Sequence, residues 1–122
     1  MVLIDSSCWV HYFRHRGDAG IRERVIHLLE QGEAAWCPLI RLELWNGVGS
    51  DADRKILRAH EVWLPDLPIT DQVWADACDL ASQCRKRGSS VPANDVLIAA
   101  CARYHNVKLE FTDAHFEFLS RI

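Results

Sequence analysis

Four acidic residues stand where predicted strands end or on the apolar side of predicted helices: Asp5, Glu43, Asp95 and Asp113. Asp5 closes the apolar run "MVLI", and Asp113 comes shortly after the apolar run "VKLEF". Acids at the carboxyl ends of parallel strands converge at one edge of a sheet, even when they are far apart in sequence. Carboxylate oxygens are the ligands that Mg²⁺ and Mn²⁺ prefer. The pattern therefore predicts a divalent-metal centre that activates a bound water.

The helical positions of Glu43 and Asp95 favour the same interpretation. On a helical wheel, Glu43 falls on the arc of Leu39 and Ile40, inside an apolar stripe. Asp95 is followed three residues later by Ile98 and so heads a buried face. A carboxylate on the inner side of a helix is costly unless it is paired with a cation or hydrogen-bonded. We therefore expect these two helices to deliver their acids to a shared site.

Each acid also has a simpler explanation. Asp5 is typical of a helix cap and Asp113 of a turn, while Glu43 could sit at the edge of its stripe beside an arginine. Asp95 could interact with the helix N-terminus, with Asn94 as the cap. Four separate explanations are then needed, whereas one metal centre accounts for all four acids. We predict that Asn94 caps this helix and that Asp95 binds metal.

Length and composition indicate one ordinary globular domain over residues 1–122. The chain is 49% apolar and 25% charged, and its formal net charge is −3. This length supports one hydrophobic core, and the mild negative charge disfavours a nonspecific DNA-binding protein. The N-terminal segment does not resemble a secretion signal, and no apolar run is long enough to span a bilayer. The five cysteines are scattered, which favours reduced thiols, and we expect a soluble, cytoplasmic protein with no membrane association.

Short apolar strands alternate with helices along the chain. Strands are predicted at 1–4, 34–37, 62–64 and 107–111, and helices at 6–13, 19–32, 38–48, 51–60, 71–88 and 94–106. Asp18 and Thr70 are expected N-caps, and Gly32 and Gly88 are expected helix stops. Strands separated by helices imply a mainly parallel sheet covered on both faces. The predicted fold class is α/β, as a three-layer α/β/α domain with a sheet of four to five strands.

Four stretches carry a resemblance to a known family. "LIDSS" contains Asp5, "LIRLEL" contains Glu43, "PANDVLIAACA" contains Asp95, and "FTDAHF" contains Asp113. In order and rough spacing the chain resembles the PIN-domain ribonucleases, and it looks most like the VapC toxins of bacterial toxin–antitoxin pairs. The resemblance covers nearly the whole chain. Its most specific parts are the stretch around Asp95 and the Asp-x-His-Phe pattern of residues 113–116.

The resemblance implies a PIN-like domain with the activity of an endoribonuclease that depends on Mg²⁺ or Mn²⁺. The four acids would hold the metal, and the substrate would be tRNA, rRNA or mRNA. A cognate VapB-like antitoxin would hold the enzyme inactive, and the protein would form a homodimer. In similar proteins the antitoxin packs an apolar segment against the early helices. Trp9, Tyr12 and Phe13 are candidates for that surface, and core packing explains them equally well.

Six further residues are candidate substrate contacts. In many relatives Thr follows the first acid, and Ser6 keeps that hydroxyl here. Relatives commonly have one residue between a late Thr and the fourth acid, whereas Thr112 directly precedes Asp113. An imidazole near the acids could contact phosphate or transfer a proton, and a dense basic group could hold the RNA backbone. The candidates are Ser6, Thr112, His115, Arg85, Lys86 and Arg87.

Other classes stay open from the sequence. A PIN-fold binding module without catalysis would share this pattern, and an aspartyl-phosphate phosphotransfer protein would also place an acid after the first strand. The phosphatases of that type usually have a second acid two residues later, where this chain has Ser7. His11 and His15 have the i, i+4 spacing of a transition-metal pair, although surface histidines often share it.

Overall fold

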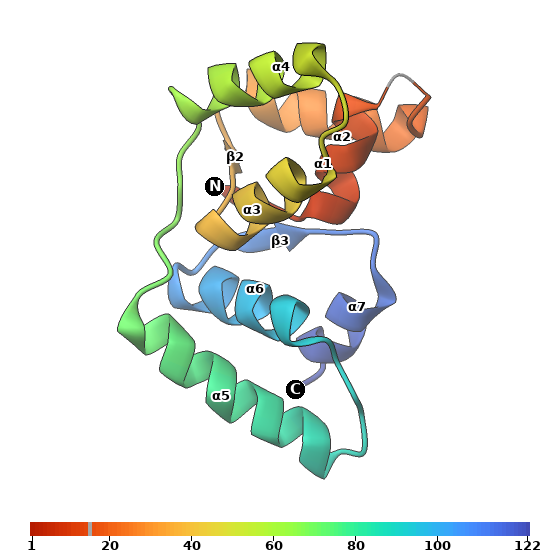
Figure 1. Cartoon of the computed structure of the whole chain (residues 1–122). Coiled ribbons are helices and arrows are strands. Elements are labelled where there is room, and N and C mark those ends of the chain that lie inside the picture. The colour runs from red at the N-terminus through yellow and green to blue at the C-terminus, as the bar shows by residue number, and fades with distance from the viewer. Residues whose placement is uncertain (15) are drawn as a thin grey trace.

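A computed structural model describes residues 1–14 and 16–122 of the chain (Figure 1). The N-terminal half contains β1 (Val2–Ile4), α1 (Ser6–Phe13), α2 (Ala19–Glu30), β2 (Ala34–Ala35), α3 (Pro38–Gly47) and α4 (Asp51–Glu61). The C-terminal half contains α5 (Asp71–Lys86), α6 (Ala93–Tyr104), β3 (Lys108–Glu110) and α7 (Ala114–Ser120). The pair of His11 and His15 suggested by the sequence involves His15, which lies outside the described residues.

The three strands form one parallel sheet in the order β2-β1-β3. Val2 is in register with Ala34 on one side and with Lys108 on the other. The central strand is buried, and Leu3 and Ile4 are inaccessible to solvent, as expected for a parallel sheet enclosed by helices. The predicted α/β class and parallel sheet are confirmed. Because all strands run the same way, their carboxyl ends meet at one edge of the sheet.

The sheet has fewer strands than expected in the part of the chain that is described. The predicted strand at 62–64 is instead a turn after α4, in which the Leu64 N–H donates to the His60 carbonyl at 2.9 Å. Val62 is exposed and Leu64 is buried, so the apolar residues at 62–64 do not form a continuous buried segment. Just after β2, the segment beyond this turn pairs with the sheet only through a parallel bridge between Trp36 and Asp66, within the described residues.

Helix ends follow the sequence signals with one exception. The Asp18 side chain accepts from the Ile21 N–H at the start of α2, and Thr70 caps α5 in the same way. Gly32 and Gly88 follow helices with positive φ, as predicted. The exception is Asn94, which was expected to cap α6. The N-cap is Pro92 without a side-chain cap bond, because the helix starts earlier and places Asn94 inside its first turn.

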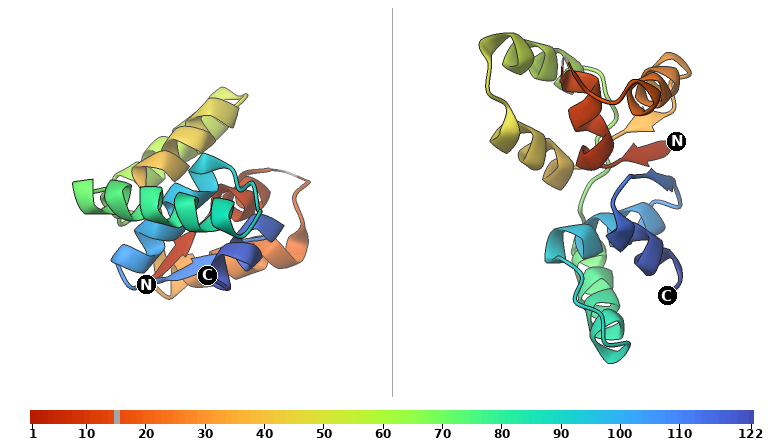
Figure 2. Two further views of the ribbon diagram at one scale, coloured as in Figure 1. Left: turned by 90° about the horizontal axis from the view of Figure 1, so that it is seen from below. Right: turned by 90° about the vertical axis from the view of Figure 1, so that its right-hand side faces the viewer.

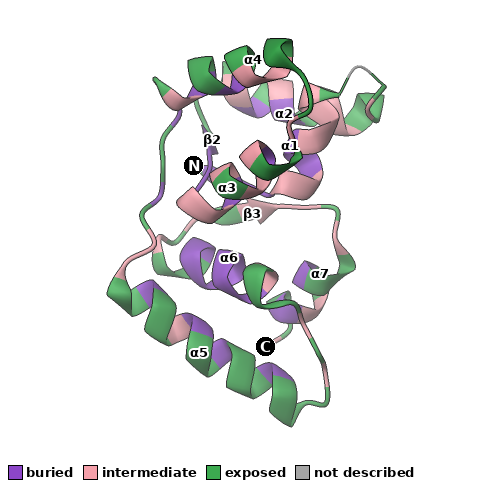
Figure 3. Cartoon of the chain, viewed as in Figure 1, coloured by how far each residue is buried: buried purple, intermediate pink, exposed green. Residues whose placement is uncertain are grey.

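Buried side chains join the two halves of the molecule into one core. The most buried helix is α6, whose residues 96–102 are all buried (Figure 3). It contacts α5, α7, α3 and β3, so it lies at the centre of the C-terminal half. Helices α1 to α4 lie in the other half of the molecule with β1 and β2 (Figure 2), where α1 packs against α2 and α3, and α2 packs against β2. No helix within residues 1–14 and 16–122 has both the length and the apolar character that a bilayer crossing requires.

Candidate metal centre

Asp5 lies at the carboxyl end of β1, where the chain turns into α1. Its N–H donates to the carbonyl of Glu110 in β3 at 2.9 Å, and its side chain caps α1 by accepting from the Ser7 N–H at 3.0 Å. The cap was the simpler explanation for this acid, and it is present. It leaves the burial unexplained, because Asp5 is only 4% exposed. Burial raises the pKa of the Asp5 carboxyl, hydrogen bonds from Ser7 and Ser6 oppose this, and the charge of Asp113 adds to the rise.

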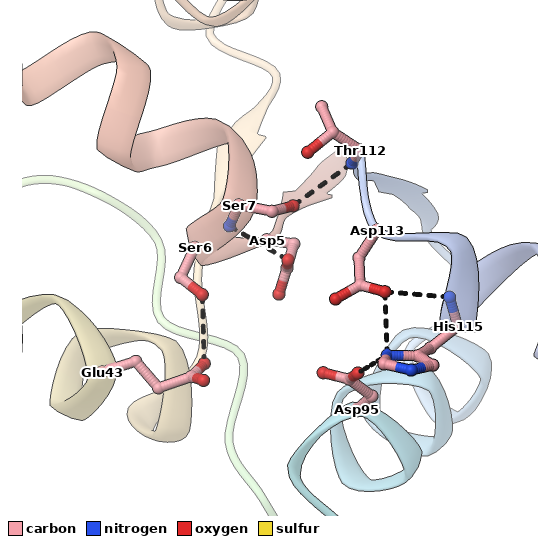
Figure 4. A network of polar contacts seen from close by, with 8 residues as sticks. All are labelled: Asp5, Ser6, Ser7, Glu43, Asp95, Thr112, Asp113 and His115. Carbon is pink, nitrogen blue, oxygen red and sulfur yellow. Dashed lines mark hydrogen bonds and ion pairs between the residues drawn. The ribbon is translucent and has the colours of Figure 1, made fainter. Parts of the chain in front are cut away.

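Glu43 reaches the same region from the middle of α3. The Ser6 hydroxyl donates to its Oε1 at 3.3 Å (Figure 4). Burial raises the pKa of the Glu43 carboxyl, and the charges of Asp5 and Asp95 raise it further. Hydrogen bonds from Ser6 and the Asn94 side chain act in the opposite direction. Glu43 is therefore half-buried among other acids, inside the stripe where the sequence placed it.

The simpler explanation for Glu43, an arginine partner at the edge of its stripe, does not hold for Arg41, which stands two residues earlier on α3. Arg41 turns away from Glu43 and pairs with Glu61 at 3.3 Å and with Asp66 at 3.1 Å. No ion pair within residues 1–14 and 16–122 involves Asp5 or Glu43. These two carboxylates are thus desolvated by the fold without a cation from the described chain.

Asp95 and Asp113 form the other side of the centre, with a histidine between them. Asp95 lies in the first turn of α6, and Asp113 is the N-cap of α7. The Nδ1 atom of His115 is 2.9 Å from Asp95 Oδ2 and 2.8 Å from Asp113 Oδ1 (Figure 4). Burial and the nearby Asp113 charge raise the pKa of the Asp95 carboxyl, while its hydrogen bond with His115 opposes the rise. These three side chains have ligand atoms within 4.8 Å of one another.

The donor set fits a hard divalent cation. Four carboxylates, from the end of β1, α3, α6 and the start of α7, face one region (Figure 4). Burial raises the pKa values of Asp5, Glu43 and Asp95, and repulsion from neighbouring carboxylates adds to each rise. Such a group is unfavourable in the absence of a cation, and oxygen ligands at a partly open site are the arrangement in which Mg²⁺ and Mn²⁺ are usually held. Asp5, Glu43, Asp95 and Asp113 are the residues that would hold such an ion.

The candidate substrate contacts divide into near and distant groups. Ser6 and His115 touch the acids directly, whereas Thr112 contributes its backbone N–H to the Ser7 hydroxyl at 3.2 Å. The basic residues Arg85, Lys86 and Arg87 lie at the C-terminal end of α5. Arg85 lines an open hollow together with Val96, the residue after Asp95. None of the four acids lines this hollow, so the structure does not bring the basic group into contact with the centre.

Sequence reasoning missed two residues that position the acids. Ser7 binds Asp5 from one side and the Thr112 backbone from the other, and it thereby ties β1 to the segment before α7. Asn94 does not cap its own helix, and its side chain instead acts to lower the pKa of the Glu43 carboxyl. The signal for Ser7 was its position two residues after a capping acid, where a backbone N–H is bound by the cap. Asn94 gave no signal of its effect on Glu43, because the two residues lie on helices far apart in sequence.

Comparison with known families identifies the class to which this fold and its acidic centre belong. The family model described as "PIN domain" matches residues 2–121. Ribonuclease VapC11 of Mycobacterium tuberculosis is 34% identical to this chain over 125 residues, which cover 100% of this chain and 93% of that protein. The chain therefore belongs to the PIN-domain family, in the group of the VapC ribonucleases.

Solved structures show the same fold at lower identity. The VapBC-1 structure from nontypeable Haemophilus influenzae matches with a TM-score of 0.75 and 18% identity, covering 100% of this chain and 95% of that one. The structure of VapC20 from Mycobacterium tuberculosis, described as a sarcin–ricin loop cleaving toxin, matches with a TM-score of 0.71 and 16% identity. That match covers 97% of this chain and 94% of the other. The whole chain thus shares the architecture of VapC proteins.

Proposed function

We propose that this protein is the endoribonuclease toxin of a VapBC-type pair and that it cleaves RNA phosphodiester bonds with a water activated by Mg²⁺ or Mn²⁺. The observation that carries the proposal is the gathering of Asp5, Glu43, Asp95 and Asp113 at one edge of the sheet, with Asp5 and Glu43 lacking an ion pair within the described residues. The relatives named ribonuclease support the same reaction class. A toxin of this kind would act on cellular RNA in the cytoplasm.

The chain's own residues fix the carboxylates before any ligand arrives. Asp5 accepts from the Ser7 N–H, and Glu43 accepts from the Ser6 hydroxyl. These hydrogen bonds restrict the rotamers of acids whose mutual repulsion would otherwise push them apart. When bound, the divalent ion supplies a water of lowered pKa and stabilises charge on the leaving oxygen. The protein's part is to hold the ligands rigid in a half-buried site that still admits a phosphodiester.

RNA binding needs cations that the centre itself lacks. Arg85, Lys86 and Arg87 at the C-terminal end of α5 are the candidates, and Arg85 lines the open hollow beside α6. They would contact backbone phosphates, which position a substrate without reading its bases. Their other role, neutralising the C-terminal dipole of α5, is compatible with this one.

A VapB-like antitoxin is the proposed partner, and the structure narrows where it would bind. Trp9 is buried in the core against Trp36, so it is not part of an exposed landing surface. Phe13 remains half-buried and lines a hollow with Val10 and Glu43. An apolar segment laid in this hollow would end beside the acid centre, where a basic side chain could reach it. The related VapBC complex supports a partner of this kind.

A homodimer is also part of the proposal. Trp74 on α5 is 54% exposed and borders an apolar hollow formed with α3 and α6. A large aromatic at the edge of an apolar hollow is the type of residue that anchors protein interfaces. Light scattering coupled to size exclusion would test this, with Trp74→Glu expected to shift a dimer to a monomer.

The alternatives from the sequence are less well supported. An aspartyl-phosphate protein must present its acid to a phosphodonor, and Asp5 is almost fully buried and used as a helix cap. A silent binding module would have no reason to keep repelling carboxylates together, because replacing one of them would relieve the strain.

The deciding experiment compares wild type with Asp95→Asn and with Asp79→Asn, an exposed acid on α5 that serves as the control. Each protein is incubated with total RNA in Mg²⁺, in Mn²⁺ and in EDTA, and new 5′ ends are mapped. We expect defined cuts from wild type and Asp79→Asn that need metal, and none from Asp95→Asn. Metal-independent cuts, or cuts that persist in Asp95→Asn, would contradict the proposal.

A further inference from the structure

His115 occupies an unusual position relative to the two acids beside it. Its Nδ1 atom is 2.9 Å from Asp95 Oδ2 and 2.8 Å from Asp113 Oδ1, so one nitrogen contacts oxygens from two helices (Figure 4). Core packing does not force this placement, because the His115 side chain is 45% exposed. The ring lies between Asp113, which is the N-cap of its own helix α7, and Asp95 of α6.

The His115 side chain is not needed to cap α7. The Asp113 carboxylate already accepts from the backbone N–H of His115 at 2.9 Å, which satisfies the start of the helix without the ring. The contact between the ring and Asp95 also spans 20 positions in sequence, so it is a tertiary contact that local helix geometry does not dictate. The helix cap therefore does not explain the orientation of the His115 ring, and the acid centre does.

The distances match neighbouring ligands of one metal ion. Adjacent ligands of an octahedral ion with bonds of about 2.1 Å lie about 3.0 Å apart. Both contacts of His115 Nδ1 are close to that edge length, and all three ligand atoms lie within 4.8 Å of one another. In the chain without metal, Nδ1–H donates to the two carboxylates; with its proton on Nε2, the imidazole offers the Nδ1 lone pair to a metal ion in its place.

We propose that His115 is a direct ligand of the metal through Nδ1, which makes the centre a mixed nitrogen and oxygen site that favours Mn²⁺ over Mg²⁺. This inference rests on the proposed function, because it concerns the same centre. Mg²⁺ prefers oxygen ligands and keeps its waters, whereas first-row transition ions gain affinity from imidazole. A site built from carboxylates alone has no such contribution. His115 thereby sets metal preference in addition to the four acids.

The test measures coordination directly, without reference to RNA cleavage. The full-length protein is loaded with Mn²⁺, and nitrogen bound to the ion is detected by electron spin-echo envelope modulation, with and without ¹⁵N-labelled histidine. Wild type should show a directly bound histidine nitrogen. His115→Gln, which keeps a hydrogen-bonding side chain without an imidazole, should bind Mn²⁺ without that signal. His27→Ala, which changes an exposed histidine on α2, is the control and should retain the signal of the bound histidine nitrogen.

Affinity measurements complete the test. Titration of Mn²⁺ by electron paramagnetic resonance, with Mg²⁺ as competitor, should show Mn²⁺ affinity falling about tenfold or more in His115→Gln while Mg²⁺ affinity changes less than about threefold. Bound Mn²⁺ without a histidine nitrogen in wild type would overturn this inference and leave the proposed function standing. Failure of wild type to bind either ion would overturn both, and Asp95→Asn binding Mn²⁺ as tightly as wild type would do the same.

Discussion

Arg41 and Glu43 lie two residues apart on α3 and take part in two groups of acids that differ in one respect. Arg41 joins Glu61 and Asp66 through its two terminal nitrogens, and Trp45 Nε1 also donates to Glu61 at 3.2 Å. Glu43 faces Asp5 and Asp95, where the described chain supplies hydrogen bonds and no paired cation at Glu43. The first group contains a cation from the protein, and the second is left for a ligand to supply one.

The difference separates acids that serve the fold from acids that serve a site. A carboxylate paired with arginine stabilises the folded chain, and its removal is expected to be felt in stability. A carboxylate held among other carboxylates opposes folding, and such a group persists where a function requires it. Removing charge from each group in turn tests this distinction.

Glu43→Gln should have the largest effect on activity. The glutamine keeps the size of the side chain and loses the charge that a divalent ion needs, so we expect RNA cleavage to fall by about a hundredfold or more. Cleavage rates of an RNA oligonucleotide spanning a mapped cut would measure it.

The matched change in the group that contains Arg41 is Glu61→Gln. It removes the same charge from an acid that lies 18 positions further along the chain and pairs with Arg41. Its cleavage rate should stay within about twofold of wild type, because Arg41 keeps Asp66 as a partner. Equal losses of activity in both variants would remove the distinction between the two groups.

Arg41→Ala should have the largest effect on stability. The change leaves Glu61 and Asp66 close together without their shared cation, and burial already raises the pKa of the Asp66 carboxyl against the opposing effect of Arg41. The residues are part-exposed, so we expect a loss of about 1–2 kcal/mol in the free energy of unfolding. Urea denaturation would measure it, and Arg41→Lys should recover part of the loss.

Asp5→Asn should change stability in the opposite direction. Asparagine also caps helices, so α1 keeps its first hydrogen bond while the buried charge disappears. We expect the metal-free variant to be about 1 kcal/mol more stable than wild type at pH 7 and to lose stabilisation by Mn²⁺. A less stable metal-free variant would show that the Asp5 charge supports the fold.

The pH dependence of that gain follows from the raised pKa of Asp5. The folded state holds the Asp5 proton more tightly than the unfolded state, so ionisation destabilises wild type as pH rises through the pKa of the folded state. The difference between Asp5→Asn and wild type should be largest near pH 7 and should vanish below about pH 4, where the carboxyl is protonated in both states. Urea titrations at pH 7, 5.5 and 4 would measure it.

The sequence predicted most of the fold because its signals are local. Asp18 and Thr70 bind N–H groups three residues away, and the alternation of short apolar strands with helices leaves a parallel sheet as the simple solution. The strand expected at 62–64 failed for a related reason. Apolar residues describe a strand only when they share a buried environment, and Val62 is exposed in a turn while Leu64 is buried.

The candidate metal centre likewise contains residues that the sequence could locate and residues that it could not. Acids at strand ends can be located from the sequence because parallel strands bring those ends together. Their partners cannot be located, since Ser6 is 37 positions from Glu43 and the contact of His115 with Asp95 crosses 20. Asn94 shows the limit most clearly. Its residue type is typical of a cap, but α6 starts at Ala93, so Asn94 lies inside the first turn, where its side chain acts on the pKa of Glu43.

Glu110→Gln should have the smallest effect on stability and cleavage. It adds to the comparison an acid at a strand end that is paired with an arginine. Glu110 ends β3, so it stands at the carboxyl end of a strand like Asp5, but its side chain pairs with Arg24 at 3.3 Å on the surface. A part-exposed pair of this kind contributes little, and we expect a change below about 0.5 kcal/mol in unfolding free energy with cleavage unaffected. A loss of cleavage would show that position at a strand end matters more than the presence of a paired cation. Unchanged cleavage, beside the loss in Glu43→Gln, would show that an acid without a protein cation marks the centre.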